Sequence, residues 1–99
     1  MDKNTILSLA PHVAKRMEYS LETFYLLNFE NDEIWTGNYS SYLVLDRLNG
    51  KNSIDTIIKD LTEEYDDFSY KELFNSTIPI FQELLDKNFI KIIQKINKE

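Results

Sequence analysis

The residues best suited to chemistry in this sequence are two adjacent carboxylate pairs, Glu63-Glu64 and Asp66-Asp67, and the single histidine, His12. Two carboxylates that converge on one substrate can serve as general acid and general base, and a histidine can carry the proton instead. Neighbouring residues on a helix point about 100° apart, so Glu63 and Glu64 do not converge on one atom. Asp66 and Asp67 fall between two predicted helices and read as a solvated loop. We therefore expect no catalysis by this chain.

The composition excludes most other kinds of reactive site. The absence of cysteine excludes thiolate metal ligands, iron–sulfur clusters, disulfides and a cysteine nucleophile. One histidine leaves no multi-histidine metal site within the chain. Two glycines and two prolines provide no material for a phosphate-binding loop. We expect neither a cofactor nor a metal ion.

The charge balance limits the possible partners. The chain has 99 residues, with 11 lysines and arginines against 17 aspartates and glutamates, and a formal net charge of −6. That sign repels nucleic acid phosphates and anionic lipids. No apolar run approaches the roughly 20 residues that span a bilayer, and the N-terminus lacks the pattern of a signal peptide. We expect a cytoplasmic protein that binds neither nucleic acid nor membrane and acts by binding another molecule.

The elements that would position a binding site change character along the chain. The first part is rich in aromatic and β-branched residues and predicts three short strands with a turn before the last. After Gly37 the apolar period becomes helical and predicts three helices, with Asn38, Ser53 and Ser69 as N-caps. The predicted strands are 13–17, 23–29 and 33–36; the predicted helices are 39–48, 54–65 and 70 to 86 or 87; and 89–93 is a short strand or a frayed helical extension.

This order predicts an α+β, winged-helix-like fold, in which a three-stranded antiparallel sheet is followed by three α-helices. No repeat or linker divides the chain, so we expect a single domain over residues 1–99 with its core at about 11–93. The third helix carries two adjoining apolar stripes that together cover roughly 160° of its surface. One stripe is Leu73, Thr77, Ile80 and Leu84, and the other is Tyr70, Phe74, Ile78, Phe81 and Leu85. The second stripe either packs in the core or lines a groove for a partner.

A series of short motifs follows the predicted strands: an asparagine with small residues, an apolar pair, an Asn-Gly turn and a serine before isoleucines. These are Asn38-Tyr39-Ser40-Ser41, Val44-Leu45, Arg47-Leu48, Asn49-Gly50, Ser53-Ile54 and Ile57, followed by Leu84 to Ile90. In this order they resemble the pattern of the PqqD family. The resemblance covers about residues 11–93. It implies a RiPP recognition element, which binds the leader segment of a ribosomally made precursor peptide and does not catalyse a reaction.

The resemblance also implies where the peptide binds. The leader adds as a fourth antiparallel strand to the edge of the third strand, beside the third helix. Strand addition takes its affinity from main-chain hydrogen bonds and its specificity from side-chain pockets. The implied strand edge is Glu33, Ile34, Trp35, Thr36 and Gly37, and the implied helix wall is Tyr70, Lys71, Phe74, Asn75, Ile78 and Phe81.

The family resemblance implies a modifying enzyme as the second partner. Such recognition elements often serve radical SAM enzymes, and ATP-dependent cyclases and proteases also use them. A separate recognition chain acts in trans, so we expect a second contact surface for that enzyme, whose position the sequence does not reveal.

Two further functions compete with leader binding. One is a generic interaction or oligomerisation module that uses the same sheet edge. The other is a DNA-binding winged helix, which is disfavoured because the second and third helices carry more acidic than basic residues.

Overall fold

The computed structural model describes residues 1–94 of the chain. Six strands and three helices follow one another in these residues. They are β1 (Ile6–Leu9), β2 (Val13–Glu18), β3 (Thr23–Asn28), β4 (Glu33–Gly37), α1 (Tyr39–Leu45), β5 (Asn49–Ser53), α2 (Ile54–Glu64), α3 (Tyr70–Asp86) and β6 (Ile90–Gln94).

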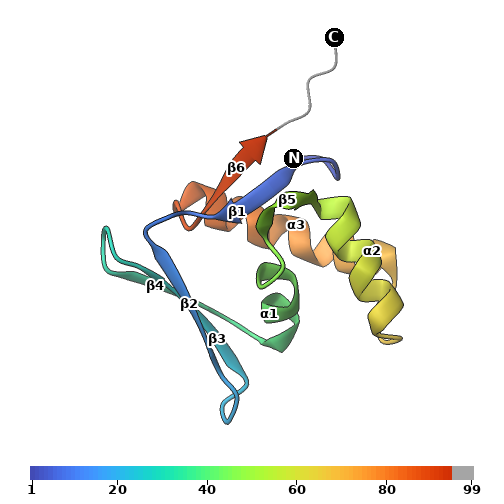
Figure 1. Ribbon diagram of the computed structural model, residues 1–99. Helices are drawn as coiled ribbons and strands as arrows, with labels where there is room; N and C mark the ends of the chain where they lie inside the picture. The colour runs from blue at the N-terminus through green and yellow to red at the C-terminus, as the bar shows by residue number, and fades with distance from the viewer. Residues whose placement is uncertain (95–99) are drawn as a thin grey trace.

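The strands form two antiparallel sheets of three strands each (Figure 1). The first has the order β2-β3-β4, and its pairs are joined by short turns without an irregularity in register. The second has the order β5-β1-β6 and joins segments from the beginning, middle and end of the described chain. In Figure 1 the first sheet extends to the lower left, the second lies at the top, and α1 lies between the first sheet and α2.

The α+β class, the first sheet and the three helices agree with the sequence prediction. The second sheet does not, because β1 and β5 were not predicted. The Asn49-Gly50 turn, which directly follows the predicted helix 39–48, begins β5 in the structure. Asn49 Oδ1 accepts hydrogen bonds from the backbone N–H groups of Lys51 and Asn52 at 2.8 and 2.9 Å, and Gly50 adopts a φ of +76°. This segment has little strand propensity of its own, so pairing with β1 decides its conformation.

The helix N-termini follow the predicted caps. The side chains of Asn38, Ser53 and Ser69 each accept a hydrogen bond from the backbone N–H three residues later. The first helix was predicted to reach residue 48 but ends at Leu45. The next N–H groups bond carbonyls three residues back, from Arg47 to Val44 and from Leu48 to Leu45, which tightens the chain into a turn. The segment 89–93, left open by the sequence, lies largely in strand β6.

The main core lies between the first sheet, the helices and β1. Its fully buried side chains include Leu7 of β1, Phe24 and Leu26 of β3, and Phe81 of α3. Leu7 precedes the segment that was expected to form the core. It is buried because β1 is the central strand of the second sheet. The inward residues of β3 alternate with half-buried ones, as expected for a sheet covered on one face.

Candidate functional site

The four outer strands of the two sheets differ in how their edges are protected. Exposed edges attract other strands, and a lysine on the edge is a common protection against such pairing. Lys15 lies on β2, Lys51 on β5 and Lys91 on β6. Within residues 1–94, β4 is the outer strand that carries no lysine or arginine; its sequence is Glu-Ile-Trp-Thr-Gly. This strand is therefore the edge best suited to accept another strand.

The opposite edge of the same sheet, strand β2, is protected by a lysine. Lys15 pairs with Leu26 of β3, whose side chain is fully buried, so Lys15 lies on the covered face of the sheet. Its Nζ lies 2.7 Å from Oδ1 of Asp46, just beyond α1. A charged side chain on the inner face disfavours pairing with a further apolar strand.

The free main-chain groups of β4 follow from the hydrogen-bond pattern of the sheet. The N–H of Phe29 donates to the carbonyl of His12 at 2.9 Å, so the main-chain N–H and C=O groups of the odd-numbered residues of β3 point toward β2. Because these groups alternate along an antiparallel ladder, the main-chain groups of Asn28, Leu26 and Phe24 point toward β4. Their partners are Glu33, Trp35 and Gly37. The N–H and C=O groups of Ile34 and Thr36 consequently point outward from the sheet.

The side chains of β4 divide between the two faces. Trp35 pairs with Leu26, is half-buried and packs against the core. Its ring covers Gly37, where an added Cβ would lie only 2.6 Å from Trp35 Cη2. The glycine therefore leaves room for the indole. Ile34 and Thr36 face the other side, and 61% of Ile34 is exposed.

A pocket of about 250 Å³ opens where β4 ends. It lies between the beginning of α1 and one flank of α3. Its lining is mixed, with apolar side chains and several hydroxyl groups. The lining residues are Asn38, Ser40, Ser41, Val44, Leu45, Leu73, Ser76, Thr77, Ile80 and Phe81. A strand edge beside this pocket combines main-chain hydrogen-bonding groups with a recess for a side chain.

The six residues predicted for the helix wall do not all face this pocket. Phe81 lines it. Tyr70 instead donates from its hydroxyl to Oδ1 of Asp55 on α2 at 2.6 Å, and the ring of Phe74 stacks on that of Tyr70 with centroids 5.9 Å apart. Ile78 lies on the same flank by helical spacing and is half-buried. Lys71 and Asn75 are exposed farther around the helix.

The flank of α3 that faces the pocket carries Leu73, Ser76 and Ile80, which the predicted site omits. The sequence held a signal for Leu73 and Ile80, which belong to the first apolar stripe of the helix, but none for Ser76, which lies in neither stripe. The sequence showed two stripes but not which one turned toward the end of β4, because that depends on how α3 packs against α1 and α2.

The Tyr70–Asp55 contact is also the clearest electrostatic feature. The hydrogen bond from Tyr70 lowers the pKa of Asp55, and the same bond raises the pKa of Tyr70 to about 12. Asp55 lies in the first turn of α2 and also forms an ion pair with Lys59 at 3.3 Å. These contacts indicate that Tyr70 helps to fasten α3 to α2.

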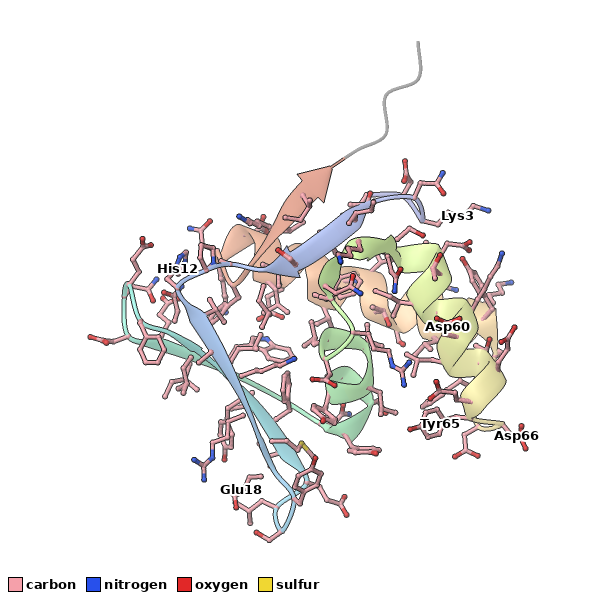
Figure 2. All side chains as sticks on the ribbon, viewed as in Figure 1. Lys3, His12, Glu18, Asp60, Tyr65 and Asp66 are labelled. Carbon is pink, nitrogen blue, oxygen red and sulfur yellow. The ribbon has the colours of Figure 1, made fainter. Side chains whose placement is uncertain are left out.

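The groups first considered for catalysis lie apart. Figure 2 shows His12 beside the first sheet and Asp66 beyond the far end of α2. The histidine and this carboxylate therefore do not form one site. Within the described residues, no cluster of three or more histidine, aspartate or glutamate side chains could hold a metal ion.

Comparison with known proteins identifies the family. The family model for coenzyme PQQ synthesis protein D (PqqD) matches residues 24–90, about two thirds of the 99 residues. The chain belongs to the PqqD family. The match spans β3 to the start of β6 and so includes β4, the pocket and α3. No curated protein and no solved structure matches this chain.

Membership of the PqqD family implies a peptide-binding chaperone role in the biosynthesis of ribosomally made, modified peptides. Members are accessory binding proteins rather than catalysts. The described helices include none that is long and apolar enough to cross a membrane. The geometry of the site in this PqqD-family chain, a bare strand edge beside a pocket, fits the binding of a peptide.

Proposed function

We propose that this chain binds the leader segment of a precursor peptide as an added strand on β4 and presents the peptide to a modifying enzyme of the radical SAM class. The observation that carries the proposal is the edge of β4. It has outward main-chain groups at Ile34 and Thr36, carries no lysine and ends at the pocket between α1 and α3. An extended peptide can pair with such an edge and insert a side chain into the adjoining recess.

We also propose that the wall of the groove is the α3 flank that carries Leu73, Ser76 and Ile80. The strand residues 33–37 are kept from the sequence prediction. Ile80 is half-buried and lines the pocket, whereas Phe74 stacks on Tyr70 beside α2. An apolar leader side chain in the pocket would bury Ile80.

The first test is a fluorescence titration with the leader peptide of the precursor encoded beside this chain. Trp35 is the only tryptophan and lies on β4, so it reports directly on that strand. We expect a saturable change with sub-micromolar to micromolar affinity. In Thr36→Pro the change should be lost, because proline removes an outward N–H without removing a bond to β3. If Thr36→Pro folds and binds the leader as tightly as wild type, strand addition is excluded.

A matched pair of variants tests the groove wall. Ile80→Ala should weaken leader binding by about 1–3 kcal/mol, the range for a buried side chain at the centre of an interface. Phe74→Ala should leave the affinity within twofold. The reverse result would place the leader on the other flank, as the sequence alone predicted. Calorimetry measures both affinities independently of Trp35.

The same edge could pair with a second copy of the chain, which is the oligomerisation function considered from the sequence. Analytical ultracentrifugation without peptide separates the two functions. A monomer that binds the leader supports recognition. A dimer that is lost in Thr36→Pro and is unaffected by leader peptide supports the oligomerisation module instead.

A further inference from the structure

The direction of an added strand determines where the modified part of the peptide emerges. This step rests on the proposed function. The chain of β4 runs from Glu33 to Gly37, so an antiparallel leader begins beside Gly37 and ends beside Glu33. The core segment follows the leader along the precursor. It therefore leaves the protein at the turn between β3 and β4, residues 29–32.

The β3–β4 turn and the adjoining start of β4 present two exposed apolar side chains. Phe29 is 68% exposed and Ile34 is 61% exposed. Ile34 pairs with Leu27, so these side chains and the turn lie at one end of the outer sheet face. Glu30, Asp32 and Glu33 surround them and are all exposed. An exposed aromatic residue within a charged rim is typical of a protein interaction site.

Several hydrogen bonds hold the turn although it is exposed. Asn28 Oδ1 accepts from the N–H of Glu30 at 2.9 Å, and Asn31 Oδ1 accepts from the N–H of Glu33 at 3.0 Å. The carbonyl of Asn28 accepts from the N–H of Asp32 at 2.8 Å. Asn28 itself is only 2% exposed, which anchors the turn in the core. A turn held by such bonds loses little conformational freedom when a partner binds it.

We infer that the β3–β4 turn, together with the start of β4, is the docking surface for the modifying enzyme, with Phe29 and Ile34 as its apolar contacts. The partner surface should be basic, with lysines or arginines around an apolar recess, because three carboxylates surround Phe29. A second copy of this chain does not meet that requirement. Its net charge is −6, and two such turns face to face would bring six carboxylates together. The enzyme then lies where the core segment emerges.

The other turn of the same sheet supplies a matched control. Tyr19 follows β2 and is 68% exposed, like Phe29. Figure 2 shows His12, whose carbonyl bonds Phe29, and Glu18, next to Tyr19, at opposite ends of β2. Tyr19→Ala therefore removes an equally exposed aromatic ring from the end of the sheet where the leader would enter.

The experiment measures leader binding and enzyme binding separately for wild type, Phe29→Ala and Tyr19→Ala. The probes are the leader peptide and the purified modifying enzyme encoded beside this chain. Phe29→Ala should bind the leader within twofold of wild type but should bind the enzyme about tenfold or more weakly. Tyr19→Ala should bind both like wild type. Glu30→Gln combined with Asp32→Asn should slow association with the enzyme and reduce its dependence on salt.

Three results would overturn the inference in different ways. Unchanged enzyme affinity in Phe29→Ala would exclude the turn as the docking surface. Equal weakening in Tyr19→Ala would show that enzyme binding is not confined to this end of the sheet. A wild-type chain that binds the enzyme but not the leader would remove the proposed function, and with it the argument from strand direction.

Discussion

Gly37 shows how a single residue shapes the candidate site. A Cβ at this position would lie 2.6 Å from Trp35 Cη2 and 3.0 Å from Ser41 Cβ. Trp35 packs against the core from the same face of β4. The absence of a side chain at Gly37 thus leaves room for the indole of Trp35 beside the beginning of α1.

Gly37→Ala should therefore destabilise the protein by about 1–3 kcal/mol, the usual cost of overpacking a well-filled site. The displaced indole should become more exposed, and its emission should move to longer wavelength. Urea unfolding and the emission spectrum of Trp35 measure both effects. Thr36→Ala, at an exposed position, serves as the control. Equal stability and emission in both variants would mean that the indole adjusts without cost.

Among the outer strands, the presence or absence of a lysine explains why β4 can pair with a further strand. Each other outer strand within residues 1–94 carries a lysine, whereas β4 carries Glu33 at its beginning and no basic residue. Edge strands usually acquire such charges because unprotected edges aggregate. An edge that omits the protection is consistent with a strand that has a natural partner.

Thr36→Lys should close that edge. A lysine beside the outward N–H and C=O of residue 36 should weaken leader binding by about tenfold or more, while surface changes of this kind alter stability by about 0.5 kcal/mol or less. Asn52→Lys adds the same charge at an exposed position of β5, which contributes no residue to the pocket, and should bind the leader normally. If Asn52→Lys weakens binding as much, the effect is due to net charge rather than to the edge of β4. Fluorescence anisotropy of a labelled leader measures both affinities.

For the whole molecule, the hydrogen bond between Tyr70 and Asp55 couples stability to pH. The pKa of Tyr70 is raised from 10.0 to about 12. The hydrogen-bonded hydroxyl therefore contributes its full share to the free energy of unfolding below pH 10, and this share is lost as the pH rises toward 12. The pKa of Asp55 is lowered from 3.8, so its contribution is present above about pH 4 and is lost as the pH falls through the lower value.

Tyr70→Phe should reduce the free energy of unfolding at pH 7 by about 1.5 kcal/mol, the lower end for a hydrogen bond to a charged group. The substitution should also make stability less dependent on pH in both the acidic and the alkaline range. Some alkaline loss should remain, since hydrogen bonding with Tyr19 raises the pKa of Tyr42 to about 12 as well. Urea unfolding between pH 3 and 11 measures the profile. A variant with the wild-type profile would show that the bond contributes nothing to folding.

Much of the fold could be predicted because its signals are local. The caps at Asn38, Ser53 and Ser69 satisfy their own helix ends, and the apolar runs of β3 and α3 specify strand and helix by their length and period. The segment from Asn49 to Ser53 could not be predicted, because its strand conformation comes from pairing with β1, more than forty residues earlier. The end of α1 was misplaced for a similar reason, since the chain turns there to reach that pairing.

From the sequence alone one can predict a small acidic domain, a strand over residues 33–36 and a helix with two apolar stripes. The three-dimensional fold is needed to show that β4 is an outer strand, that Ile34 and Thr36 direct their main-chain groups outward, and that Ile80 rather than Phe74 lines the pocket. Periodicity places residues on a face of an element. The rotation of that face toward a neighbour depends on packing among β4, α1, α2 and α3, which are distant in sequence.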